Sequence, residues 1–236
     1  AFYGVPDLTN SEGIHTNAMY GFLNIMFKFI DEEKPDYITV AFDVHAPTFR
    51  HKRFADYKGT RKPMLPELKQ QVPLIKEILK AMNIKVVEKE GFEADDLLGT
   101  IAKKCAGQGI DVSVISGDRD LLQLADNNIK IRIPKTKKGV TEVEDYLPSD
   151  VNDLYGVTPI EFIDVKALMG DTSDNIPGAP GVGPKTASSL IMQYHSIENV
   201  FEHLEELKPP KAKKSISENV EQIKLSKFLA TIDINV

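Results

Sequence analysis

Eight carboxylates fall in four short clusters of the sequence, at positions where a metal-dependent reaction could use them. The clusters are Asp43; Glu93, Asp95 and Asp96; Asp118 and Asp120; and Asp171 and Asp174. Several carboxylates brought within a few ångströms repel one another and lose hydration unless cations neutralise them. Oxygen ligands select hard ions, so the clusters predict two or more Mg²⁺ or Mn²⁺ ions rather than zinc. The chemistry that fits is water activated by a metal and directed at a phosphodiester.

Each cluster also has an ordinary structural interpretation, because Asp caps helix starts and Asp-Asn near Gly and Pro is common in turns. Glu93 and Asp96 are three residues apart and share a helix face, whereas Asp95 points about 100° away. Asp95 is therefore expected to reach the site only through water or to serve as a cap. No Ser-His pair, Cys-His pair or glycine-rich phosphate loop competes for the chemistry, and no ligand spacing occurs among His15, His45, His51, His195 and His203.

Three basic segments could hold a nucleic acid. Residues 50–62 carry six Lys or Arg with two interleaved aromatic residues, a mixture that grips phosphates and stacks on unpaired bases; they include Arg50, Lys52, Arg53, Phe54, Tyr57, Lys58, Arg61 and Lys62. Residues 175–187 have the glycines and the helix-starting proline of a helix-hairpin-helix, with Gly181, Val182, Gly183, Lys185 and Thr186 as phosphate-binding candidates. Residues 208–214 are a weaker third patch. A solvated loop or a plain turn is the alternative for each segment.

The net charge of −6 does not exclude nucleic acid as a partner, because the acid is concentrated. Setting aside the eight clustered carboxylates leaves a balance of +2 for the rest of the chain. No apolar run approaches the roughly 20 residues of a membrane span, and residues 1–10 lack the pattern of a signal peptide. The composition predicts a soluble, cytoplasmic protein without a membrane partner.

Alternating strands and helices are predicted up to about Pro148, which indicates an α/β fold with a mostly parallel central sheet and flanking helices. Strands are expected at 37–42, 84–87 and 112–116, and helices from about Thr16, at 65–82, at 93–106 and from Leu121. The first three acidic clusters follow strands or open a helix between them, so they should converge at one sheet edge. The chain opens on a loop at residues 1–6, and an N-terminal strand is therefore expected to be missing.

Helices alone are predicted after Pro148, at about 159–169, 184–194, 197–207 and 216–230. This divides the chain into an α/β core at 1–148, which includes the basic part of the chain at about 45–70, and a helical DNA-binding region at 149–236. The helix-hairpin-helix falls at about 175–195. The fourth acidic cluster lies in the helical region and has to fold back over the sheet edge.

The motifs together resemble a known family. Phe42-Asp43, Thr48-Phe49-Arg50-His51, Tyr57-Lys58, Glu93-Ala94-Asp95-Asp96, Gly117-Asp118-Arg119-Asp120, Met169-Gly170-Asp171, Ser173-Asp174-Asn175 and Gly181-Val182-Gly183 follow in one order. In this order they resemble the 5′ nuclease domains of bacterial DNA polymerase I over essentially all 236 residues. The resemblance implies a PIN-like α/β nuclease core, a helical arch at about 45–70 and a helix-hairpin-helix. It also implies 5′→3′ exonuclease and flap endonuclease activity that removes RNA primers and displaced strands.

The resemblance assigns roles to residues. Asp43, Glu93, Asp95, Asp96 and Asp118 would form a first metal group, and Asp118, Asp120, Asp171 and Asp174 a second. Tyr57, Lys58 and Arg61 would hold the 5′ strand and the scissile phosphate, with Lys58 stabilising charge in the transition state. Gly181 to Lys185 would grip the duplex backbone, with K⁺ as a further ion at the hairpin. The family's opening strand ends in an Asp that is a metal ligand, and this chain starts just after that point.

The expected partners are 5′ flaps, nicked or branched duplexes and RNA-primed 5′ ends, bound by a monomer in the bacterial cytoplasm near the nucleoid. A polymerase domain linked after Val236 and a free-standing nuclease both fit the sequence. Two other functions stay open. One is a structure-specific DNA-binding module with impaired catalysis; the other is a PIN-type ribonuclease, which shares the carboxylates but gives no reason for the helix-hairpin-helix.

Overall fold

The fold is described from a computed structural model that covers residues 4–137 and 140–236. Part of the expected opening loop, residues 1–3, lies outside the described residues. The first half contains the elements α1 (Asn17–Glu33), β1 (Thr39–Ala41), α2 (Phe49–Arg53), α3 (Pro66–Lys69), α4 (Gln71–Ala81), β2 (Lys85–Val87), α5 (Ala94–Ala106), β3 (Val112–Ile115), the 3₁₀ helix η2 (Arg119–Leu124), β4 (Ile129–Lys137) and β5 (Val140–Tyr146).

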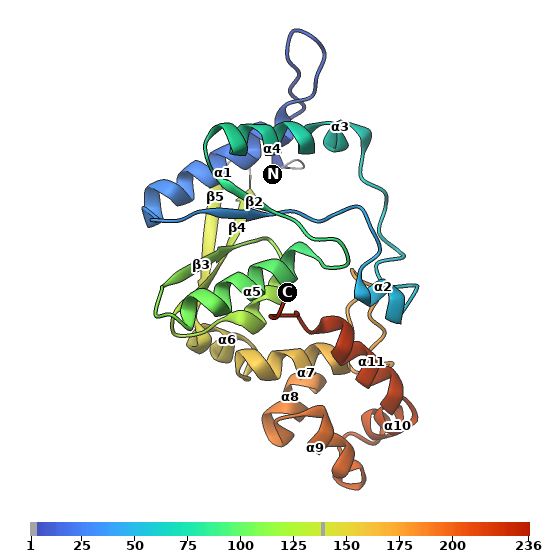
Figure 1. Ribbon diagram of the computed structural model, residues 1–236. Coiled ribbons are helices and arrows are strands. Elements are labelled where there is room, and N and C mark those ends of the chain that lie inside the picture. The colour runs from blue at the N-terminus through green and yellow to red at the C-terminus, as the bar shows by residue number, and fades with distance from the viewer. Residues whose placement is uncertain (1–3, 138–139) are drawn as a thin grey trace.

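Parallel pairing joins the strands that end at the site. β1 pairs with β2 in parallel, with Val40 opposite Val86, and β3 pairs with β4 in parallel, with Val114 opposite Ile131. α5 packs against both β1 and β3 and so joins the two small sheets, while α4 packs on β2 and against α1. The carboxyl ends of β1 and β3 therefore lie on either side of the start of α5 (Figure 1). This confirms the predicted α/β class and the position of the first three acidic clusters.

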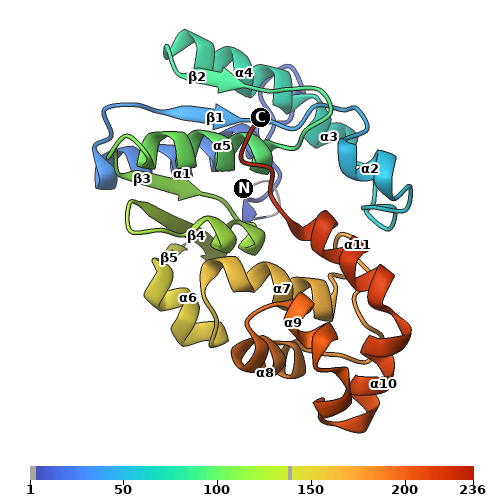
Figure 2. The ribbon, with the colours of Figure 1, turned by 60° about the horizontal axis from the view of Figure 1, so that its bottom comes forward.

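The second half is helical. Its elements are α6 (Pro148–Tyr155), α7 (Pro159–Met169), α8 (Pro184–Tyr194), α9 (Ile197–Glu202), the 3₁₀ helix η3 (Leu204–Glu206), α10 (Pro210–Glu218) and α11 (Val220–Ala230). α7 contacts η2, α8 and α11, and the helices gather at one end of the molecule (Figure 2). One buried cluster runs from Val114 in β3 through Leu121 in η2 and Leu168 in α7 to Ile191 in α8. The two halves thus share a core.

Several predicted elements differ from the observed ones. The predicted helix at 65–82 is two helices, α3 and α4, and the predicted helix at 197–207 is α9 followed by η3. Residues 121–124 belong to a 3₁₀ helix rather than the start of an α-helix, and 216–230 divides between α10 and α11. β4, β5 and α6 were not predicted at all. β5 pairs with β4 in antiparallel fashion, with Thr141 opposite Thr136, so the sheet is mixed at this edge.

Among the described residues, no helix combines the length and the apolar character that a membrane span requires.

Candidate metal-binding active site

The start of α5 carries three of the predicted ligands, and the structure reverses two of their predicted orientations. Asp96 is fully buried and is directed at Arg50, whose two terminal nitrogens each lie 2.8 Å from one of its carboxylate oxygens. The same carboxylate accepts a 2.9 Å hydrogen bond from the Glu93 backbone N–H in a capping box. Asp96 therefore faces the protein interior. It was expected to share the site face with Glu93.

Asp95 is the third residue of this cluster, and the charges of the other acids act on it. In the described part of the chain its carboxylate has no hydrogen-bond or ion-pair partner. Burial, together with the charges of Asp118, Asp43 and Glu93, raises the pKa of Asp95 to about 7, although Lys58 opposes the shift. Asp43, exposed at the end of β1, accepts a 2.8 Å hydrogen bond from the Ala94 backbone N–H and is held beside the helix start. Asp95 was expected to reach the site only through water or to serve as a cap, whereas the nearby charges of Asp118, Asp43 and Glu93 place it among the acids.

The second carboxylate group joins the two halves of the chain. Asp118 caps η2 by accepting a 2.9 Å hydrogen bond from the Asp120 backbone N–H. The buried Lys166 of α7 lies 2.7 Å from Asp120 and also pairs with Asp171. The fourth acidic cluster does fold back over the sheet edge, as predicted, and a lysine joins it to the third.

Asp120 and Asp171 respond to this arrangement in opposite ways. Burial and the carboxylates of Asp118 and Asp171 raise the pKa of Asp120 to about 6, although Lys166 opposes them. Burial alone would raise the pKa of Asp171, but hydrogen bonds from Lys166 and Ser173 lower it to about 2. Asp171 is thus a fixed anion at neutral pH, whereas burial keeps the pKa of Asp120 raised in spite of its ion pair with Lys166.

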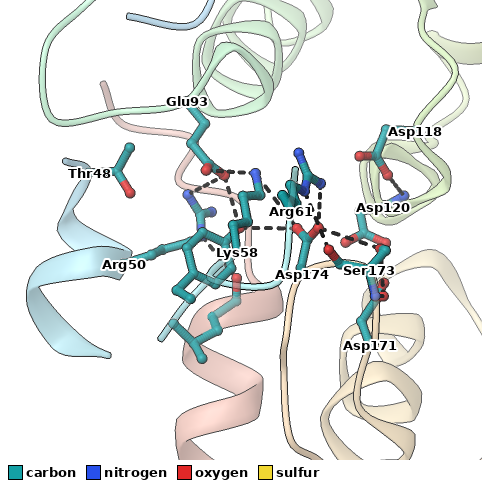
Figure 3. Close-up of polar contacts among 12 residues, drawn as sticks. Thr48, Arg50, Lys58, Arg61, Glu93, Asp118, Asp120, Asp171, Ser173 and Asp174 are labelled. Atoms are coloured by element: carbon teal, nitrogen blue, oxygen red, sulfur yellow. Dashed lines mark hydrogen bonds and ion pairs between the residues drawn. The ribbon is translucent and has the colours of Figure 1, made fainter. Parts of the chain in front are cut away.

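Lys58 and Arg61, which belong to the predicted arch, lie between the two carboxylate groups (Figure 3). The Lys58 ammonium is 2.7 Å from Glu93 and 3.6 Å from Asp174, and Arg61 pairs with the other oxygen of Asp174. The Tyr57 hydroxyl donates to Glu93 at 3.1 Å and to Asp174 at 3.2 Å. Figure 3 shows Glu93 on one side of these groups and Asp118 and Asp120 on the other.

The arch segment is anchored by its backbone as well as its side chains. Lys58 adopts a left-handed conformation with φ of 55°, and its backbone N–H donates to the carbonyl of Asp174 at 2.8 Å. Tyr57 is 3% exposed and packs with Ile176 and Leu229. Burial and the nearby Glu93 and Asp174 charges raise the pKa of the Tyr57 hydroxyl, which keeps it a donor.

The donor set fits divalent cations. In residues 4–137 and 140–236, no three acidic, His or Cys side chains are grouped closely enough to hold an ion as they stand. Lysine and arginine occupy the spaces between the carboxylates, where a cation is needed. Burial is the largest cause of the raised pKa values of Asp95 and Asp120, and the nearby carboxylates add to it in both. Clustered carboxylate oxygens are the donors that Mg²⁺ and Mn²⁺ prefer.

The predicted DNA-binding residues divide between surface and interior. Exposed positions are Lys52, Arg53, Lys62, Gly181, Gly183 and Lys185; half-buried positions are Phe54 and Thr186. Val182 is 3% exposed and packs in the hydrophobic core. Arg50 is 2% exposed, and its guanidinium is used by Asp96, Glu93 and two backbone carbonyls. Arg50 was predicted to contact DNA, and its burial corrects that prediction.

Two residues that contact the acidic clusters were not predicted from the sequence. Lys166 lies between Asp120 and Asp171, and Gln123 in η2 donates to the Asp120 carbonyl at 3.0 Å. Lys166 stands five residues before Asp171 within an apolar helix, α7, and a buried lysine must find carboxylates. That feature could have indicated it. Nothing in the sequence distinguishes Gln123 from any other polar residue.

Without divalent ions, the raised pKa of Asp95 should make stability depend on pH. A carboxyl group whose folded-state pKa is above its unfolded value stabilises the protein at low pH, and this contribution is lost as pH rises. For Asp95 the window runs from its ordinary 3.8 to about 7. We therefore expect Asp95→Asn to raise the unfolding temperature in EDTA at pH 8 by at least about 3 °C. At pH 4 the gain should vanish.

Thermal unfolding followed by circular dichroism at the two pH values measures this effect. Asp126→Asn is the matched control, since its pKa is lowered by Lys103 and Asn127 and the substitution should not stabilise the protein at pH 8. An Asp95→Asn variant that is less stable than the wild type at pH 8 would show that Asp95 is not under electrostatic stress.

An α/β fold that collects carboxylates and basic arch residues at one sheet edge defines the class of the protein as a nuclease. Comparison with protein families agrees. A family described as "5′-3′ exonuclease, N-terminal resolvase-like domain" matches residues 1–156, and "5′-3′ exonuclease, C-terminal SAM fold" matches residues 157–236. The chain belongs to the 5′-3′ exonuclease family.

Curated relatives include DNA polymerase I of Bacillus caldotenax and of Bacillus subtilis (strain 168). Each is 48% identical over 232 residues, which is 98% of this chain and 26% of the relative. The chain therefore spans about a quarter of the length of the curated relatives it matches. The predicted resemblance to the nuclease domains of bacterial DNA polymerase I is confirmed.

Solved structures share the fold. T5 5′-exonuclease with bound zinc has a TM-score of 0.75 at 22% identity, covering 91% of this chain and 81% of that one. The catalytic core of Rad2 in complex with DNA substrate has a TM-score of 0.58 at 16% identity, covering 94% and 69%. These likenesses confirm the predicted 5′ nuclease fold.

Proposed function

We propose that this chain cuts DNA at 5′ ends and 5′ flaps by hydrolysing a phosphodiester with two or more Mg²⁺ or Mn²⁺ ions. The observation that carries the proposal is the meeting of carboxylates from both halves of the chain around Lys58 and Arg61. Glu93 and Asp174 belong to different halves, and both bind Lys58. Support also comes from relatives named DNA polymerase I, from T5 5′-exonuclease with divalent metal ions and from Rad2 with DNA substrate.

The residues that would hold the ions form two groups that share Asp118. The first consists of Asp43, Glu93, Asp95 and Asp118, with Asp96 supporting them from the interior; the second consists of Asp118, Asp120, Asp171 and Asp174. Divalent ions bound there would activate the attacking water and stabilise the leaving oxygen. Lys58 and Arg61 would hold the scissile phosphate. To do so, they exchange their ion pairs with Glu93 and Asp174 for contacts with the DNA phosphate.

The substrate is assigned from the surface around the site. The exposed Lys52, Arg53 and Lys62 would hold the 5′ strand, and the hairpin at Gly181 to Lys185 would hold the duplex backbone. Nicked and branched duplexes and RNA-primed 5′ ends are the substrates proposed for the bacterial cell, with the chain acting as a monomer near the nucleoid. A polymerase domain following Val236 belongs to the same proposal.

Potassium at the hairpin stays a prediction. It is tested by comparing the affinity for flap DNA in KCl and in LiCl at equal ionic strength. Tighter binding in KCl is expected, and equal binding would exclude a specific ion.

Lys58→Ala is expected to lower kcat by about 100-fold, because a single positioned cation or donor at the transition state contributes on that scale. The Lys58 ammonium lies between Glu93 and Asp174, so it can reach a phosphate held there. Lys62→Ala is the control, since Lys62 is exposed four residues later and should change mainly KM. Single-turnover and steady-state cleavage of flap DNA separates the two effects. Equal losses of kcat in both variants would remove Lys58 from the chemistry.

Substrate choice tests the proposed function. Matched oligonucleotides would present a 5′ DNA flap, a 3′ DNA flap and a single-stranded RNA of the same sequence to the protein in Mg²⁺. Cutting at the base of the 5′ flap, with the other two left intact, is expected. Preferential cutting of the RNA would favour the ribonuclease alternative, and tight binding without cutting would favour the DNA-binding module.

A further inference from the structure

The end of α11 and the chain that follows it contact both the first turn of α5 and η2. Figures 1 and 2 both show the chain returning from α11 to α5. We call residues 229–233 the bridging segment. On one side, Arg50 donates to its carbonyls, from Nε to Leu229 at 2.9 Å and from Nη2 to Thr231 at 2.6 Å. Asp96 accepts from the Asp233 backbone N–H at 2.9 Å. This side is therefore fixed to α2 and to the first turn of α5.

Gln123 holds the other side of the bridging segment. Its Nε2 donates to the Ala230 carbonyl at 2.9 Å, and its Oε1 accepts from the Ile232 backbone N–H at 2.9 Å. The same Nε2 donates to the carbonyl of Asp120 at 3.0 Å. Leu229 and Ala230 end α11, so the Arg50 and Gln123 side chains satisfy backbone groups that the helix leaves unpaired at its C-terminus and in the extended chain beyond it. The side fixed by Gln123 is thus tied to η2, which carries Asp118 and Asp120.

The bridging segment is closely packed around Ile232. Arg50 is 2% exposed, Gln123 is 5% exposed and Ile232 is 6% exposed. A Cβ atom added at Gly99 in α5 would lie 2.8 Å from Ile232 Cγ2, so the helix and the segment are already in close contact. A buried guanidinium that binds a carboxylate in bidentate fashion and two carbonyls has a single geometry.

We propose that Arg50 and Gln123 are positioning residues, which set the Glu93–Asp95 group and the Asp118–Asp120 group at a working separation through the bridging segment. The proposal rests on the proposed function, because only a reaction that uses both groups together needs their separation fixed. Arg50 also reaches Glu93 directly, at 3.4 Å. Partners that orient metal ligands in this way contribute about 10- to 100-fold to activity or metal affinity.

Two conservative substitutions test the proposal. Arg50→Lys keeps the positive charge but loses the planar group that binds Asp96 and the two carbonyls together. Gln123→Met keeps the volume and loses every hydrogen bond of the amide. Each is expected to lower kcat on a 5′-flap substrate by about 10- to 100-fold. Affinity for the same DNA in EDTA should stay within about twofold, since neither side chain reaches the surface.

The double variant distinguishes positioning from a general loss of stability. Because both residues act through one segment, Arg50→Lys with Gln123→Met should lose little more kcat than the more affected single variant. All assays are run well below the unfolding temperature of each variant. Gln108→Met, at an exposed position in the turn after α5, is the matched control and should behave as the wild type.

The outcomes separate the two proposals. A wild-type chain that does not cut flap DNA counts against the proposed function. A cutting wild type with unchanged kcat in both single variants overturns the positioning role alone. Weaker DNA binding in EDTA by Arg50→Lys would return Arg50 to the DNA-contacting residues, and fully multiplicative losses in the double variant would show that no shared segment connects them.

Discussion

Asp118→Ala should lower the rate of flap cleavage by about three orders of magnitude, the scale on which a principal electrostatic element of a transition state acts. Asp118 is the carboxylate that both proposed metal groups share. Its charge raises the pKa of Asp95 on one side and of Asp120 on the other. Removing it weakens both groups at once, whereas any other single carboxylate belongs to one. Cleavage is measured under single-turnover conditions with excess enzyme.

DNA binding should survive the same substitution. Asp118 contacts the Asp120 backbone N–H and none of the exposed lysines and arginines of the arch. Flap affinity measured in EDTA is therefore expected to be equal to or tighter than that of the wild type, since a negative charge is lost. Asp126→Ala is the control, because Asp126 pairs with Lys103 in the last turn of α5, at the opposite end of that helix from Asp95. Retention of more than about a tenth of wild-type cleavage by Asp118→Ala would exclude a shared ligand.

Gly178→Ala should destabilise the protein by about 3 kcal/mol, from left-handed backbone strain together with overpacking. Gly178 has φ of 60°, and an added Cβ would lie 2.3 Å from the backbone nitrogen of Gly170. The hairpin closes on the end of α7 at this point, so neither backbone can give way. Unfolding in urea, followed by circular dichroism, measures the loss of free energy.

Gly183→Ala is the matched control in the same hairpin. Gly183 has φ of −88°, and an added Cβ meets no atom within 4 Å, so stability should change little. If Gly178→Ala lowers the free energy of unfolding as little as Gly183→Ala does, the hairpin does not close tightly on α7. Because the hairpin also fixes Asp171 and Asp174, Gly178→Ala is expected to reduce cleavage as well.

β1, β2, β3 and the four acidic clusters could be predicted because their evidence is local. A buried strand is a short apolar run, and an acid that follows it must lie at its carboxyl end. β4 escaped prediction because Pro134 interrupts it and Arg132 lies within it. Pro134 falls past the residues that pair with β3, where β4 has a partner on one side only and proline is tolerated. Arg132 is buried because Glu33 and Asp145 neutralise it.

The errors at the site have a common physical cause. Charge density along residues 50–62 predicts a phosphate-binding surface, but Arg50 pairs with Asp96, 46 positions away, and that pairing has no local signature. Helix periodicity predicted that Glu93 and Asp96 would share the site face, but Asp96 is fully buried against Arg50. Periodicity does not show that Asp96 turns back to cap the helix and to bind Arg50. It also does not show that the charges of the other acids act on Asp95. Long-range pairing decides such orientations, and sequence spacing does not.

Cleavage of a 5′-flap DNA by the wild-type chain, measured as Mg²⁺ is titrated into protein stripped with EDTA, tests the central claim most directly. We expect no cutting in EDTA and cutting at the flap base that rises with Mg²⁺. Asp95→Asn should remain inactive across the whole titration. Flap DNA that is bound tightly but left uncut at every Mg²⁺ concentration, or cut equally well in EDTA, would contradict a metal-dependent 5′ nuclease.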